Sequence, residues 1–225
     1  MTSSERKLSN HIVSIELESD KKIKKSDYYI VRITITGIKK RKLIGVAEEL
    51  CRGNVPKAEE LCRGNVSNDI QNWVPPIVVY VCDAEIQLLF STTEEEHNLG
   101  GSHQKICSLL TSSLTLHFNR ACSTSIVELE NRVLILCYFQ CKMCAHSQAK
   151  MLSLLPEKHQ AKSKFKSLTF SEQMKILKKE NVSWDEFDNY EKYGTFVKIN
   201  NGRLEKFSEN IDFTDTEEHE SFFFD

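Results

Sequence analysis

The stretch IVVYVCDAEIQLLF, residues 77–90, decides how this chain folds. β-Branched and aromatic residues fill both of its arms, Pro75-Pro76 blocks a helix before it, and the polar run 91–93 ends it. We therefore predict two buried strands joined at an acidic corner, Asp83-Ala84-Glu85. The corner can be a place where carboxylates carry chemistry. The alternative is an acidic turn without function, because Asp favours turns for purely local reasons.

Length and composition indicate a globular protein. The 225 residues are 40% hydrophobic, enough to bury a sizeable core. No apolar run approaches the roughly 18 residues that span a bilayer, and the start MTSSERKLSN has no signal-peptide core. Eight cysteines without a secretory signal are typical of reduced thiols. We predict a cytoplasmic location, with the nucleus as the alternative, and no membrane.

The net charge of −2 hides an asymmetry along the chain. Residues 209–225 hold seven acidic residues and no Lys or Arg, whereas residues 1–208 hold 30 Lys and Arg against 25 Asp and Glu. The basic residues gather at 21–25, 39–42 and 158–166. Such groups can contact phosphates or simply form solvated faces, and the sequence favours neither. The segment 209–225 is predicted to be disordered.

The order of predicted elements indicates an α+β fold. Residues 28–36 alternate apolar and polar side chains as a strand does, 102–118 form a helix, 132–137 a short strand, and 138–155 a second helix. Together with the hairpin they match the βαββαβ pattern of a ferredoxin-like, polymerase-type palm with a C-terminal helical appendage, which the capping box 169–172 opens. In that layout Thr34 neighbours the corner at 83–85, a geometry that suits two-metal catalysis.

We predict three regions: a palm-like, catalytic-type domain over 1–155, a C-terminal region over 156–208 that packs on the palm, and the acidic tail 209–225. The sequence AEELCRGNV occurs at 47–55 and again at 58–66. Two copies are too few for a repeat array, so we interpret 47–66 as a local insertion without chemistry of its own.

Two local patterns could carry chemistry. Cys137-x3-Cys141-x2-Cys144-x-His146 has spacings of iron–sulfur or zinc sites, but on a helix His146 points nearly opposite the cysteines, which favours core packing. Gly100-Gly101-Ser102-His103-Gln104-Lys105 stands at a helix start, where backbone N–H groups and Lys105 can hold phosphate. The alternative for the second pattern is an ordinary glycine loop with a helix cap.

Taken together in order, four stretches resemble the tRNA(His) guanylyltransferase family, including the guanylyltransferase-like members that add nucleotides in the 3′-to-5′ direction. The resemblance covers roughly residues 8–200. It is carried by YIVRITITGIK (29–39) against V-R-I-D-G-R-G-F, YVCDAEIQLLF (80–90) against Y-x-Q-S-D-E-I-S-L-L-F, GGSHQKICSLL (100–110) against G-G-R-x-x-K-L, and the closing region 165–198 with VSWDEFDNYEKYGTF.

The resemblance implies a polymerase palm that takes part in tRNA processing. It implies activation of a tRNA 5′ end with GTP or another nucleoside triphosphate, followed by nucleotide addition with two Mg²⁺ ions. The implied partners are tRNA or another RNA, a nucleoside triphosphate, and further subunits in a homo-oligomer or in a mixed oligomer with a paralogue.

Departures from the family pattern fall at the positions of its chemistry. The two metal-binding Asp positions correspond to Thr34 and Ala84, neither of which binds a hard divalent ion as a carboxylate does. Asp83 is the remaining metal candidate, with Asp83 and Glu85 as the catalytic candidates. By resemblance, the nucleotide-binding residues correspond to Gly101, Ser102, Lys105 and His146, where Ser102 replaces an Arg. Lys192 and Gly194 also match the family.

Three hypotheses follow. The first is a divergent pseudoenzyme that retains binding of tRNA and nucleotide without catalysis, because two-metal chemistry depends on the ions for charge stabilisation. The second is an active tRNA nucleotidyltransferase that uses Asp83 and Glu85 with Mg²⁺. The third is a structural, non-catalytic subunit of an oligomer.

Overall fold

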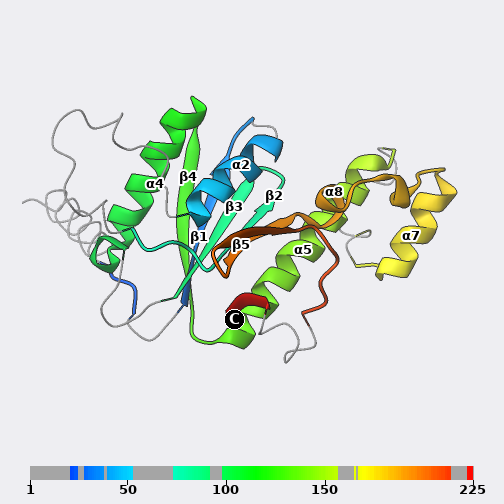
Figure 1. Cartoon of the computed structure of the whole chain (residues 1–225). Coiled ribbons are helices and arrows are strands. Elements are labelled where there is room, and N and C mark those ends of the chain that lie inside the picture. The colour runs from blue at the N-terminus through cyan, green and yellow to red at the C-terminus, as the bar shows by residue number, and fades with distance from the viewer. Residues whose placement is uncertain are drawn as a thin grey trace, which may run out of the picture.

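A computed structural model of the chain describes residues 21–24, 28–37, 40–52, 73–91, 98–156, 165, 167–213 and 222–224. Within them, a six-stranded antiparallel sheet has the order β4-β1-β3-β2-β5-β6 (Figure 1). The elements are β1 (Tyr28–Ile35), α2 (Lys40–Cys51), β2 (Val78–Cys82), β3 (Glu85–Ser91), η2 (Asn98–Gly101), α4 (His103–Phe118), β4 (Cys122–Leu129), α5 (Arg132–Leu154), α7 (Phe170–Lys179), η4 (Trp184–Glu186), α8 (Asn189–Tyr193), β5 (Thr195–Asn200) and β6 (Arg203–Phe207).

The first part of this order is β1-α2-β2-β3-α4-β4, which confirms the predicted βαββαβ palm. β1 lies between β3 and β4 and pairs with both in antiparallel register. β5 then pairs with β2, so the region predicted to pack on the palm also extends its sheet. None of the described helices combines the length and the apolar character that crossing a bilayer requires.

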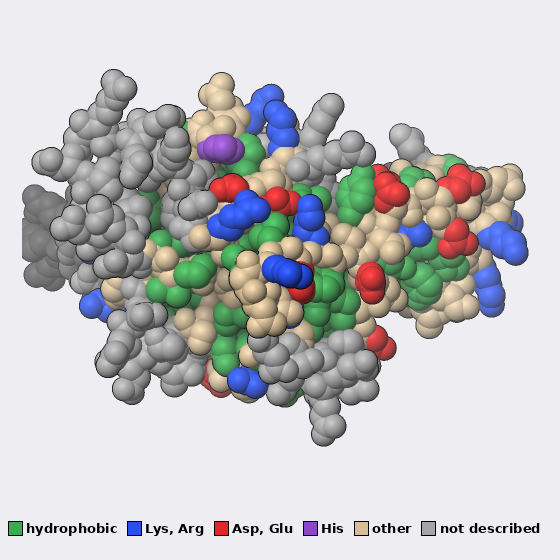
Figure 2. All heavy atoms as spheres, viewed as in Figure 1, with side chains coloured by type: hydrophobic (Ala, Val, Ile, Leu, Met, Phe, Trp, Pro, Cys, Tyr) green, Lys and Arg blue, Asp and Glu red, His purple; other side chains and the backbone are tan. Residues whose placement is uncertain are grey.

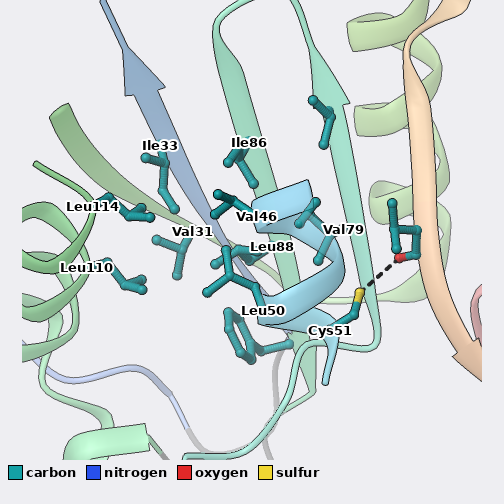
Figure 3. Close-up of a cluster of buried hydrophobic side chains, with 14 of the residues drawn as sticks. Val31, Ile33, Val46, Leu50, Cys51, Val79, Ile86, Leu88, Leu110 and Leu114 are labelled. Carbon is teal, nitrogen blue, oxygen red and sulfur yellow. Dashed lines mark hydrogen bonds between the residues drawn. The ribbon is translucent and has the colours of Figure 1, made fainter. Parts of the chain in front are cut away.

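One face of the sheet is covered by α2 and α4 (Figure 1). Val31, Ile33 and Ile35 alternate along β1 and are fully buried on this face. Figure 3 shows Val31 and Ile33 packed among side chains of both helices, and it marks the hydrogen bond that Cys51 Sγ donates to the carbonyl oxygen of Val197 at 3.2 Å. Burial raises the pKa of the Cys51 thiol to about 12, so Cys51 acts as a core residue.

The opposite face of the sheet is covered by α5 and by the segment Phe222–Phe224. Phe223 is 2% exposed, and its ring stacks on that of Phe139 with centroids 5.2 Å apart. The ammonium of Lys198 donates a hydrogen bond to the carbonyl oxygen of Phe222 at 2.8 Å. At these residues the structure differs from the predicted disorder of 209–225, because three consecutive aromatic rings bury more apolar surface than the acidic composition suggests.

The strand predicted at 132–137 is wrong. These residues form the first turns of α5, whose N-cap Asn131 accepts a hydrogen bond from the backbone N–H of Leu134 at 3.0 Å. The fourth strand of the palm is β4, immediately before it. β4 lies at an edge of the sheet and is rich in Ser and Thr, so it lacks the strong apolar pattern by which buried strands are found.

The C-terminal part of α5 packs with α7 and η4 around a third apolar cluster that includes Met151, Leu177 and Trp184. The predicted capping box is confirmed, because Thr169 and Glu172 exchange side-chain to backbone hydrogen bonds at the start of α7. Residues 53–72, which include the second copy of the repeat, and the basic run 157–164 lie outside the described residues.

Candidate functional site

The acidic corner lies beside the end of β1, as the sequence predicts. Thr34 pairs with Glu85 across the two strands, and the backbone N–H of Ile35 donates to the carbonyl oxygen of Ala84 at 2.8 Å. Asp83 occupies the turn with φ 45°, a left-handed conformation that Asp tolerates better than most residues.

A row of polar side chains occupies the same face of the sheet as α5. Residues directly opposite each other in antiparallel strands point to the same side, so Thr34 shares its row with Glu85 and Ser123. Arg32 shares the next row with Gln87 and Ser125. We call this surface the polar shelf; it consists of Arg32, Thr34, Glu85, Gln87, Ser123, Ser125 and, from α5, Lys142.

Glu85 is the centre of the hydrogen bonds on the polar shelf. Arg32 donates to both carboxylate oxygens, from Nε to Oε2 at 3.0 Å and from Nη2 to Oε1. Lys142 Nζ donates to Oε2 at 3.3 Å, and Gln87 Nε2 donates to the same oxygen at 3.2 Å. The carboxylate therefore has two cationic partners and one neutral donor.

These contacts favour the ionised forms of Glu85 and Arg32. Burial alone would raise the pKa of Glu85, but the hydrogen bonds and charges of Arg32 and Lys142 outweigh it and leave the pKa of that carboxyl below its ordinary value. The hydrogen bond to Glu85 in turn raises the pKa of Arg32. At neutral pH the three groups carry two positive charges and one negative charge.

The other acidic residue of the corner contacts a different partner. Asp83 Oδ2 lies 2.9 Å from Nδ1 of His146 on α5, whose side chain is 2% exposed, while the side chain of Asp83 is 64% exposed. The structure thus brings His146 to the corner with Asp83, and both of these predicted site residues lie at the same end of the sheet as Glu85.

The Mg²⁺ ions implied by the family resemblance do not fit this set of side chains. Mg²⁺ requires several hard oxygen ligands in near-octahedral geometry. Thr34 and Ala84 supply no carboxylate, and Glu85 is engaged by Arg32 and Lys142. Across the residues that the structure describes, no group of three or more His, Cys, Asp or Glu side chains is placed to hold a metal ion.

The predicted phosphate loop lies at the other end of the sheet. Ser102 caps α4 by accepting a hydrogen bond from the backbone N–H of Lys105, whose side chain is exposed. Just after this cap, His103 Nε2 lies 2.8 Å from Oε1 of Glu128. Glu128 pairs with Tyr29 at the start of β1.

The corner at 83–85 adjoins the last residues of β1, whereas the loop adjoins Tyr29 near the first. At about 3.4 Å per residue, these two places lie roughly 17 Å apart along the strand. The structure therefore does not bring Gly101, Ser102 and Lys105 together with Asp83 and Glu85. Helix direction accounts for the separation, because α4 starts beside the first residues of β1 and runs toward its end, where β4 begins.

The cysteine pattern on α5 does not pack as predicted. Cys137, Cys141 and Cys144 are exposed, while His146 is buried. The prediction of core packing for the cysteines is wrong, because the apolar face of α5 is formed instead by residues such as Leu136, Phe139 and Met143.

Lys192 and Gly194, the two further positions of the family resemblance, lie in a turn that is held by packing and hydrogen bonds. Gly194 has φ +85°, and a Cβ there would lie 2.6 Å from the ring of Tyr80. The hydroxyl of Tyr80 donates to the carbonyl oxygen of Tyr193 at 2.7 Å. The hydroxyl of Ser147 donates to the carbonyl oxygen of Lys192 at 2.6 Å. These contacts hold the turn before β5 against β2 and α5.

Sequence reasoning missed Arg32 and Lys142 as members of the site. The signal for Arg32 was its position two residues before Thr34, which places both side chains on one face of the strand. Lys142 precedes His146 by four residues, the spacing of neighbours along a helix.

Comparison with known proteins finds similarity in structure alone. No protein-family profile and no curated protein sequence matches the chain. A bacterial tRNA(His) guanylyltransferase-like protein in complex with ATP has a TM-score of 0.64 at 17% identity, over 96% of this chain and 99% of that one. Such a protein in complex with GTP has a TM-score of 0.58 at 16% identity, over 97% and 99% of the two chains.

The tRNA(His) guanylyltransferase of Saccharomyces cerevisiae has a TM-score of 0.53 at 13% identity, over 88% of this chain and 95% of that one. These structures match most of the chain at 13–17% identity. The chain therefore has the fold of the tRNA(His) guanylyltransferase-like proteins.

Proposed function

We propose that this chain is a divergent, non-catalytic relative of the tRNA(His) guanylyltransferases that binds a nucleoside triphosphate and tRNA. The observation that carries the proposal is the state of the corner on an otherwise complete palm. Thr34 and Ala84 occupy the positions where the family has metal-binding Asp, and neither has a carboxylate. The carboxylate of Glu85 is neutralised by Arg32 and Lys142. Two-metal phosphoryl transfer needs ions that this donor set does not hold.

Binding of nucleotide is supported by the fold, since similar structures are complexes with ATP and with GTP. Binding of tRNA is supported by basic surface away from the corner. Lys175, Lys178 and Lys179 follow at i, i+3 and i+4 along α7 and are all exposed. Figure 2 shows Lys and Arg side chains at the end of the molecule that α7 forms.

The test of catalysis is a transfer assay. The full chain is incubated with Mg²⁺, labelled GTP and 5′-phosphorylated tRNA, beside an active tRNA(His) guanylyltransferase as the positive control. We expect no label on the tRNA from this chain. Transfer that is abolished by Asp83→Ala would overturn the proposal and favour an active enzyme that uses Asp83.

The test of binding measures tRNA affinity as a function of salt. Because Lys and Arg contacts release counterions, the logarithm of the association constant should fall linearly with the logarithm of the salt concentration. The charge-removing variant Lys175→Gln/Lys178→Gln/Lys179→Gln should weaken tRNA binding and flatten that slope by about 1 to 3. Affinity that is absent or independent of salt would refute tRNA binding.

A further inference from the structure

We propose that the polar shelf holds the phosphates of a nucleoside triphosphate without a divalent ion, with Arg32 and Lys142 supplying the positive charge. The inference rests on the proposed function, and it assigns the nucleotide a site and a mode of binding. It follows from four features of the shelf: its cations, the carboxylate that fixes them, its hydroxyls, and two buried polar atoms beside it.

The two cations have donors to spare. A guanidinium has five N–H donors and an ammonium three, and each group uses only part of this capacity on Glu85. The side chain of Arg32 is 40% exposed and that of Lys142 is 25% exposed, so both reach solvent. The planar guanidinium matches two phosphate oxygens at once, and the ammonium adds a point charge beside it.

Glu85 keeps the two cations on the shelf. A carboxylate in a metal site would hold a divalent ion that in turn contacts phosphate. Here the same kind of group holds one guanidinium and one ammonium, and the shelf retains one net positive charge. Asp83 is the other acidic group near the corner, and it lies against His146. Glu85 is therefore a positioning residue for the two groups that would contact the ligand.

Hydroxyl groups continue the shelf across β1 and β4. Ser125 lies opposite Arg32, and Ser123 lies opposite Thr34. Both serines are exposed and Thr34 is half-buried, whereas Val31, Ile33 and Ile35 on the other face of β1 are fully buried. Hydroxyls donate to phosphate oxygens, while a carboxylate at position 34 would repel them unless an ion lay between. The substitution that removes a metal ligand thus favours direct phosphate contact.

Two buried polar atoms, one on the shelf and one beside it, give independent support. Within the described part of the chain, Oε1 of the fully buried Gln87 and the hydroxyl of Tyr138 make no hydrogen bond. Buried polar groups are nearly always paired in folded proteins, so such atoms indicate where a ligand or solvent binds. Burial raises the pKa of Tyr138 to about 12, so its hydroxyl stays protonated and can donate to a phosphate.

The experiment is a calorimetric titration of GTP and of ATP into the full chain, once with excess EDTA and once with Mg²⁺. We expect dissociation constants that agree within about threefold between the two conditions, because the contacts are to side chains. Arg32→Gln and Lys142→Gln should each weaken binding by about tenfold. Arg203→Gln, which removes an exposed cation on β6 at the opposite edge of the sheet, is the matched control and should bind as the wild type does.

A second variant tests the shelf without touching Glu85. Ser125→Asp places a negative charge on the exposed edge of the shelf and should weaken GTP binding by about tenfold. Ser108→Asp, at an exposed position on α4, is its control and should leave binding unchanged. Thermal unfolding of each variant verifies that it is folded.

Three outcomes would overturn the inference: no GTP binding, binding that requires Mg²⁺, or equal affinities for Ser125→Asp and Ser108→Asp. The same preparations are assayed for tRNA binding and label transfer. A chain that binds tRNA but not GTP rejects this inference and keeps the RNA part of the proposed function. Metal-dependent GTP binding accompanied by transfer rejects both.

Discussion

Replacing Phe223 by alanine tests whether the segment 222–224 belongs to the core. The ring is 2% exposed, it stacks on Phe139 with centroids 5.2 Å apart, and it contacts Phe213 at 5.3 Å. Truncating a buried Phe to Ala costs about 3–5 kcal/mol, which includes the cavity that remains. The short segment can shift to fill part of that cavity, so we expect the lower end, about 3 kcal/mol.

The measurement is urea denaturation followed by fluorescence, supported by a thermal melt. At this chain length 1 kcal/mol corresponds to roughly 2–4 °C, so Tm should fall by about 6–12 °C. The matched control is Phe170→Ala, because Phe170 is 52% exposed at the start of α7 and its loss should cost under about 1 kcal/mol. Equal losses for the two variants would refute the packing of the segment on α5 and restore the predicted disorder.

Two further substitutions test the corner and the turn before β5. Because the pKa of Glu85 is lowered in the folded chain, the stability it contributes is present above the ordinary value of 4.5 and is lost as pH falls through the lowered value. Glu85→Gln should therefore cost about 1 kcal/mol at pH 7 and progressively less toward pH 3 in urea titrations; a cost independent of pH would contradict the charge argument. Gly194→Ala should lower stability by about 2 kcal/mol or more, because its Cβ would lie 2.6 Å from the Tyr80 ring. Gly202→Ala shares the positive φ but has nothing within 4 Å, so a thermal melt that gives equal losses for both would exclude the contact with Tyr80.

The palm was predictable because its central strands carry strong local signals. β1 alternates one apolar face with one polar face, and the hairpin of β2 and β3 is apolar on both sides of a two-residue turn. The edge strand β4 was missed because half-exposed serines and threonines carry little pattern. The apolar start of α5 was mistaken for a strand, since a short apolar run does not by itself distinguish the two conformations.

The site was predictable only in part, because pairing partners are set by tertiary structure. The predicted strand order correctly placed Thr34 next to the corner. It could not give the register that sets Arg32 beside Glu85, nor the direction of α4 that carries Lys105 to the far end of the sheet. Local sequence identifies which groups are available, whereas register and helix direction decide which of them meet.

The two faces of β1 carry different kinds of side chain near its end, and this affects which substitutions the strand can accept. Val31, Ile33 and Ile35 are fully buried on one face, while Arg32 and Thr34 lie on the opposite face, where Ile30 is the fully buried residue. A substitution at Thr34 therefore leaves the buried residues of β1 in place. A strand built in this way can change the polar groups that it presents while the side chains that hold the sheet and helices together stay the same.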